Sequence, residues 1–131
     1  MKALDTGVLL GLLEGSTKVR DQVRRLRGVE LATTEANLLE LAYLAGAGSP
    51  TARRGRLAAL EKLRQRLTVL PLDARAVQRS TEQVARLGER ISPTAALMLG
   101  ALQAAGCEEL LTDDPRSITG DWGLRVRSLS I

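Results

Sequence analysis

Histidine is absent from the 131-residue chain, and its absence excludes several kinds of catalytic site. Without an imidazole, the chain can build neither a Ser–His or Cys–His nucleophile pair nor a histidine-ligated metal site. Cys107 is the single cysteine, so no disulfide can form within the chain, and a reducing, cytoplasmic location is expected. If the chain is an enzyme, its carboxylates are the expected catalytic groups.

Aromatic residues and long apolar runs are also scarce. There is no Phe, one Tyr and one Trp, so Leu, Val and Ala must fill the core. Hydrophobic residues make up 44% of the chain, which is enough for a folded domain, and 131 residues fit a single one, residues 1–131. No apolar run approaches the roughly 20 residues that span a bilayer, so neither a membrane segment nor a signal peptide is expected.

The charge of the chain is moderately basic, with 19 Lys and Arg against 15 Asp and Glu, a net charge of +4. Arginines cluster in residues 24–27 and 53–56. Such clusters attract polyanions, including RNA, or simply form the solvated faces of helices. Both interpretations remain open from the sequence.

Short strand-like segments alternate with segments of helical periodicity along the whole chain. The expected strands are residues 2–4, 29–33, 67–72, 109–112 and 124–126. The expected helices are residues 8–13, 18–27, 35–46, 51–66, 74–87 and a last one from Ser92 to Gly106. Thr34, Asp73 and Ser92 stand where helix N-caps are expected. The alternation predicts an α/β fold with a parallel sheet covered by helices on both faces.

Acidic residues follow two of the expected strands. Asp5 comes directly after the first strand, and Asp113 and Asp114 come after residues 109–112. Glu40 lies within an otherwise apolar helical segment. Ligands bind beyond the carboxyl ends of parallel strands, and converging carboxylates without histidine suit Mg²⁺ or Mn²⁺. Each acid also has a purely structural interpretation, as a helix cap, an exposed helix residue or a turn residue.

Four segments together resemble a known family: "MKALDTGVLLGLL", "TTEANLLELAYLA", "VLPLDARAV" and "ISPTAALMLGALQAAGCEELLTDD". In this order they look like the landmarks of PIN (PilT N-terminus) domains, in particular those of the VapC-like toxins of prokaryotic toxin–antitoxin pairs. The resemblance implies a three-layer α/β/α sandwich with a central, mostly parallel sheet of four to five strands. It also implies a Mg²⁺- or Mn²⁺-dependent endoribonuclease that leaves 5′-phosphate and 3′-hydroxyl ends. The implied partners are an RNA substrate, a small cognate antitoxin protein and a second copy of the chain in a homodimer.

The same resemblance assigns roles to individual residues. The catalytic and metal-holding acids fall on Asp5, Glu40 and Asp114. Supporting roles fall on Thr6, Thr112 and Asp113. Glu35, in the same helical segment, is an outside candidate for the role given to Glu40.

Two positions depart from the family's pattern. Gly7 stands where a small polar residue is common. Counting back from Gly106 places an expected acid of the penultimate helix at Ala95. Three possibilities are open: a natural loss that weakens the site, an introduced substitution that disarms a nuclease, or a different register in which Thr94 or Asp121 compensates.

The missing acid also keeps a second function open, that of a non-catalytic PIN-like module that binds RNA or an antitoxin. RNA would be held through its phosphates by the basic helices at residues 18–27 and 51–66, because aromatic stacking platforms are nearly absent. We expect Trp122 to pack against the sheet. Tyr43 is compatible with a place beside the site or in the core.

Overall fold

The computed structural model describes residues 1–129, apart from the side chain of Glu89. Within that range five strands form one parallel sheet in the order β3-β2-β1-β4-β5. The strands are β1 (Lys2–Leu4), β2 (Leu31–Thr34), β3 (Thr68–Leu70), β4 (Glu109–Thr112) and β5 (Arg125–Ser128). The expected parallel sheet of four to five strands is therefore confirmed.

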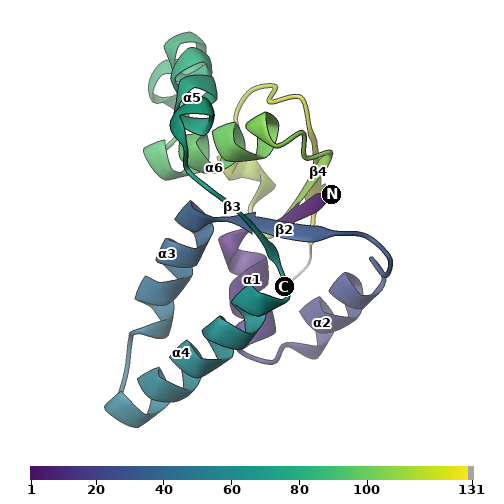
Figure 1. Cartoon of the computed structure of the whole chain (residues 1–131), viewed down its shortest axis with the longest axis vertical. Coiled ribbons are helices and arrows are strands. Elements are labelled where there is room, and N and C mark those ends of the chain that lie inside the picture. The colour runs from purple at the N-terminus through teal and green to yellow at the C-terminus, as the bar shows by residue number, and fades with distance from the viewer. Residues whose placement is uncertain (130–131) are drawn as a thin grey trace.

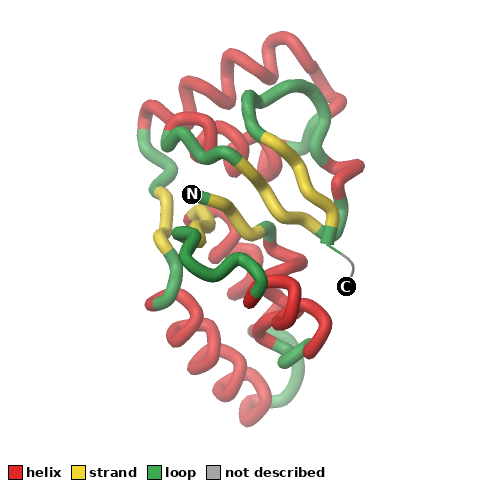
Figure 2. Tube along the Cα trace, turned by 90° about the vertical axis from the view of Figure 1, so that its right-hand side faces the viewer, coloured by secondary structure: helices red, strands yellow, loops and turns green. Residues whose placement is uncertain are grey.

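Helices connect the strands and cover both faces of the sheet. They are α1 (Thr6–Leu13), α2 (Thr17–Arg24), α3 (Glu35–Ala45), α4 (Pro50–Gln65), α5 (Ala74–Leu87) and α6 (Pro93–Ala104), with short 3₁₀ turns η1 (Gly88–Arg90) and η2 (Pro115–Ser117). Helices α5 and α6 lie on one side of the strands and α1 to α4 on the other (Figure 1). The strands run between the two sets of helices in the perpendicular view as well (Figure 2), which confirms the three-layer sandwich.

Alternation along the central strands produces two separate cores. In β1, Ala3 belongs to the cluster beneath α6, whereas the next residue, Leu4, belongs to the cluster beneath α1. Leu110 and Leu111 of β4 divide between the clusters in the same way. Successive side chains of a strand point to opposite faces, so a short run of apolar residues is buried on both sides.

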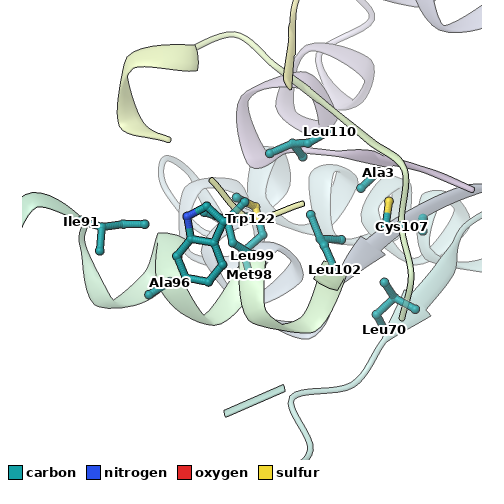
Figure 3. Close-up of a cluster of buried hydrophobic side chains, with 11 residues drawn as sticks. Ala3, Leu70, Ile91, Ala96, Met98, Leu99, Leu102, Cys107, Leu110 and Trp122 are labelled. Carbon is teal, nitrogen blue, oxygen red and sulfur yellow. The ribbon is translucent and has the colours of Figure 1, made fainter. Parts of the chain in front are cut away.

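Trp122 belongs to the first of these cores and is 2% exposed. It lies over the helix that carries Ala96 and Met98 (Figure 3). Its indole N–H donates a hydrogen bond of 2.9 Å to the carbonyl oxygen of Thr119, which satisfies the polar atom that burial removes from water. The expectation that Trp122 packs against the sheet is confirmed.

The helix N-termini lie where the capping residues predicted them. The side chains of Thr34, Asp73 and Ser92 accept hydrogen bonds from the backbone N–H three residues later. The helix expected at residues 18–27 ends earlier in the structure, because α2 ends at Arg24. The chain then continues through tight turns to Gly28, whose φ is 78°. None of the helices within residues 1–129 combines the length and the apolar character that crossing a membrane requires.

Candidate metal centre

The acidic residues singled out in the sequence surround one hollow at the carboxyl edge of the sheet. Strands β1 and β4 pair in parallel, with Leu4 opposite Leu111, so the residues that follow them emerge side by side. The hollow has a volume of about 330 Å³. Four carboxylates line it: Asp5, Glu40, Asp113 and Asp114. They come from three segments of the chain that are far apart in the sequence.

Asp5 is the most firmly held of the four. Its Oδ1 accepts hydrogen bonds from the backbone N–H of Thr6 at 2.8 Å and from the Nδ2 of Asn37 at 3.2 Å. Its Oδ2 accepts a bond of 2.6 Å from the hydroxyl of Thr112. Asp5 is also the N-cap of α1. The same carboxylate therefore caps the helix and lines the hollow. Each carboxylate oxygen has about two lone pairs, and Oδ2 uses one of them here.

Glu40 is exposed, yet it is tied to the site through Thr6. The Thr6 hydroxyl donates a hydrogen bond of 3.1 Å to Oε1 of Glu40. The expectation of an apolar face around Glu40 was wrong in part, because the adjacent Leu39 is 62% exposed while Leu38 and Leu41 are buried. Glu40 lies at an exposed position of α3 that borders the hollow, so it lines the hollow without being buried.

Asn37 is the residue that sequence analysis missed. It is 1% exposed, and its Nδ2 lies within hydrogen-bonding distance of Asp5, Thr6 and the sulfur of Met98. Its Oδ1 accepts a bond of 2.7 Å from the hydroxyl of Thr34. Asn37 therefore joins α3, α1 and α6 beneath the carboxylates. A signal existed, since it is the one asparagine in the chain and lies three residues before Glu40.

Thr112 links Asp5 to the turn that carries Asp113 and Asp114. Its side chain is fully buried, and its hydroxyl, besides donating to Asp5, accepts a bond of 3.1 Å from the backbone N–H of Asp114. Asp113 and Asp114 are exposed residues of the turn that follows β4. The Asp113 carboxylate lies against Gly7 in the first turn of α1.

Ala95 lines the same hollow from the first turn of α6. The position assigned to the missing acid is therefore in contact with the site, and Thr94 lines it too. Asp121 is not among the lining residues, and its Oδ1 accepts a hydrogen bond from the N–H of Gly123 instead. Glu35 is likewise outside this lining and lies 3.6 Å from a guanidinium nitrogen of Arg64.

The charge of the hollow is not neutralised by the protein. Among the described residues, none of the four carboxylates forms an ion pair, and no lysine or arginine lines the hollow. Glu109, at the other end of β4, contrasts with them, because it pairs with Arg127 at 2.6 Å and with Lys2 at 3.6 Å. Unpaired carboxylates and hydroxyls are the hard oxygen donors that Mg²⁺ and Mn²⁺ prefer.

The donor chemistry thus fits a divalent cation, but the donors are not yet gathered around one point. Across residues 1–129, leaving aside the side chain of Glu89, no three carboxylates or thiols are close enough together to hold a metal ion as they stand. Glu40, Asp113 and Asp114 are exposed, so an ion held by all of these residues would have to draw their carboxylates towards Asp5.

Comparison with solved structures shows close likeness of fold at low sequence identity. The chain resembles VapBC2 from Rickettsia felis bound to a fragment of its promoter DNA, with 15% identity, 98% of both chains covered and a TM-score of 0.79. It also resembles DNA-bound VapBC from Salmonella typhimurium, with 22% identity and a TM-score of 0.80. That match covers 97% of this chain and 96% of the other. VapC20 of Mycobacterium tuberculosis, a toxin that cleaves the sarcin–ricin loop, is 18% identical to this chain. The match covers 93% of this chain and 92% of VapC20, with a TM-score of 0.64.

Comparison with curated proteins gave no match. The family model of the PIN domain, in contrast, matches residues 2–119, which contain all four carboxylates of the hollow. The chain therefore belongs to the PIN domain family.

Proposed function

We propose that this protein is a divalent-metal-dependent endoribonuclease of the VapC-like toxin type. The observation that carries the proposal is the unneutralised hollow, which carboxylates from three distant segments line at the carboxyl edge of a parallel sheet. Membership of the PIN family supports phosphodiester hydrolysis, and one structural neighbour is an RNA-cleaving toxin. Asp5, Glu40 and Asp114 are the proposed metal ligands and catalytic residues.

Surrounding residues restrain two of the three proposed ligands. Thr112, Asn37 and the N–H of Thr6 restrain Asp5, while the Thr6 hydroxyl restrains Glu40. A bound Mg²⁺ or Mn²⁺ would offset the charge of the phosphodiester and lower the pKa of a water molecule. Restrained carboxylates reduce the reorganisation that binding requires, which favours catalysis. The products would carry 5′-phosphate and 3′-hydroxyl ends.

The proposed contact with RNA rests on the basic surface. Arg53 and Arg54 are exposed on α4, and the net charge of +4 attracts a polyanion towards an otherwise acidic site. Other basic residues have different surroundings: Arg20 and Arg24 of α2, Lys62 of α4 and its C-cap Arg66 border a separate groove.

That groove is the proposed site for a small antitoxin protein. It has a volume of about 510 Å³, and its lining combines the four basic residues just named with apolar residues that include Leu13, Val23 and Leu63. An acidic, amphipathic segment would match both the apolar and the basic residues of this lining. The neighbours solved as VapBC complexes support such a partner. Co-purification with the product of an adjacent short reading frame, lost on Val23→Glu, is the test.

A homodimer is proposed through a different face. Leu39 and Tyr43 of α3 are 62% and 75% exposed, and they border a hollow that Leu72 and Leu97 also line. Exposed apolar groups that gather in this way are typical of protein interfaces. The occupant we propose is the same face of a second copy.

The test of the nuclease function compares Asp5→Asn with Asp21→Asn. Asparagine is also a good N-cap, so the first variant removes the charge while α1 keeps its capping group. Asp21 is exposed on α2, and its variant removes the same charge away from the hollow. With single-stranded RNA and Mn²⁺, we expect the wild type and Asp21→Asn to cleave and Asp5→Asn to lose about 10²-fold or more in rate.

The non-catalytic binding module is the competing function, and Ala95 in the wall of the hollow is the observation that favours it. Under that function the wild type would retain RNA on a filter at low salt, but Mn²⁺ would neither promote cleavage nor raise the melting temperature. A metal that binds only the folded state must stabilise it by mass action, so the melting experiment separates the two functions.

A further inference from the structure

Gly7 is a glycine whose backbone does not require one. It lies in the first turn of α1, and it is not among the glycines with positive φ. Glycine within a helix is less favourable than alanine, because the backbone loses more conformational freedom on folding. The absence of a side chain at this position therefore needs a different physical reason.

The reason visible in the structure is the side chain of Asp113. A Cβ at position 7 would overlap the Cγ and both carboxylate oxygens of Asp113. Any residue other than glycine would displace this carboxylate, and the displacement would cost little because the carboxylate is the exposed end of a flexible side chain. The small polar residue that the family pattern favours at position 7 is incompatible with the observed position of Asp113.

The two departures from the family pattern thus meet in one hollow. Ala95 removes a carboxylate from the wall formed by α6, and Gly7 admits one beside α1. We propose that Asp113 replaces the carboxylate missing at position 95 and takes part in holding the divalent cation. This inference rests on the proposed metal-dependent function and adds to it a residue outside the three-acid set.

A purely structural role for Asp113 makes a different prediction. Helix α1 has no acid of its own in the first turn, and a carboxylate near a helix N-terminus stabilises the helix dipole. In that case neutralising Asp113 would lower the melting temperature of the metal-free protein. If Asp113 instead belongs to the metal site, its removal relieves repulsion among carboxylates, so the metal-free protein would melt at the same temperature or higher.

Titration calorimetry with Mn²⁺ on matched variants provides the test. We expect Asp113→Asn to weaken Mn²⁺ binding by about tenfold or more, and Gly7→Ala to weaken it as well by displacing Asp113. The decisive variant is the double substitution Asp113→Asn with Ala95→Asp, which should regain affinity because it restores the number of carboxylates. Asp21→Asn is the control for loss of one negative charge.

Three outcomes would overturn the inference. If Asp5→Asn abolishes binding but Asp113→Asn binds as the wild type does, the proposed metal site stands and Asp113 has no part in it. If the double variant fails to regain affinity, the two positions are not interchangeable. If the wild type itself binds no Mn²⁺ at millimolar concentration, both the proposed function and this inference are wrong.

Discussion

At the scale of single residues, Asn37 is the clearest case of a buried polar group that organises the site. Its side-chain amide bonds residues of three elements, and its exposed fraction is 1%. A buried hydrogen-bonding group that loses its partner retains the full cost of its desolvation. The consequences of removing Asn37 should therefore extend to both stability and metal binding.

Asn37→Ala is expected to lower the free energy of unfolding by about 1–3 kcal/mol, because the buried Thr34 hydroxyl loses its acceptor and Asp5 and Thr6 each lose a donor. Mn²⁺ affinity should fall too, since Asp5 loses one of its restraints. Urea denaturation followed by calorimetry measures both quantities. Gln78→Ala, which removes an exposed amide from α5, is the control and should change neither. An unaltered stability in Asn37→Ala would contradict the role given to Asn37.

Ala95→Asp addresses the missing acid directly. Because position 95 lines the hollow, a carboxylate there should increase both Mn²⁺ affinity and the rate of RNA cleavage. The metal-free protein should melt at a lower temperature, since another negative charge joins a group that has no counter-ion. Ala58→Asp on the exposed face of α4 is the control. If the two variants bound Mn²⁺ equally, the alignment at Ala95 would be wrong.

The acids that line the hollow were easier to predict from the sequence than the contacts that surround them. Asp5 and the pair Asp113 and Asp114 follow strands whose carboxyl ends meet at one edge of the sheet, and Glu40 interrupts an apolar segment, so local patterns singled these acids out. The choice of Asp114 over Asp113 came from the resemblance to PIN domains. Asn37 was missed, because its partners lie in elements whose relative placement no local pattern determines. The place of Asp113 depends on a missing Cβ in another element, which is a property of packing and not of spacing.

At the scale of elements, the contact between α5 and α6 sets the position of the helix that carries Ala95. The Ser80 hydroxyl donates to the carbonyl oxygens of Ala96 at 2.7 Å and Ala76 at 3.0 Å. Gly100 lies opposite, where a Cβ would overlap the Ser80 hydroxyl and approach the backbone of α5. The helices can therefore lie this close only because position 100 has no side chain.

Gly100→Ala should separate α5 from α6 and destabilise the protein by about 1–3 kcal/mol, despite the better helix propensity of alanine. Gly55→Ala is the matched control, because a Cβ at this helical position on α4 meets nothing within 4 Å. It should stabilise the protein by about 0.5–1 kcal/mol. Chemical denaturation measures both changes in the free energy of unfolding. If Gly100→Ala were as stable as the wild type, the close packing of α5 against α6 would be refuted.

Element boundaries show where local signals are sufficient. The N-termini at Thr34, Asp73 and Ser92 were predicted correctly because each cap is a local hydrogen bond. The C-terminus of α2 was not, because the basic residues after Arg24 are compatible with either a helix or a turn. The limits of β1 and β4 were predicted correctly, whereas those of β2, β3 and β5 shifted by one or two residues, since pairing with a neighbour decides which residues join the sheet.

At the scale of the whole molecule, the acidic hollow and the apolar groove are separate surface features, because they share no lining residue. The acidic hollow is lined from α1, α3 and α6 together with the turn after β4, whereas the apolar groove with its basic residues is lined largely from α1, α2 and α4. A partner bound in the groove need not contact the carboxylates. The exposed apolar residues of α3 form a further face that borders the hollow through Glu40 and Thr94.

That third face gives the prediction on assembly. Light scattering after size exclusion should show the wild type at twice the mass of one chain. Leu39→Glu should give a monomer, because a buried charge without a partner opposes association. Leu57→Glu places the same charge at a 40%-exposed leucine of α4 and should leave the dimer intact. A monomeric wild type would contradict the proposed dimer, and loss of the dimer in both variants would contradict its location.

The measurement that tests the central claim most directly is a crystal soaked in Mn²⁺ and examined for anomalous scattering. The claim is that Asp5, Glu40 and Asp114 hold one divalent cation at the carboxyl edge of the sheet. We expect a single strong anomalous peak in the hollow, in contact with carboxylate oxygens of all three residues, and its loss in Asp5→Asn crystals. A hollow without a peak, or a peak that Asp5, Glu40 and Asp114 do not contact, would contradict the account.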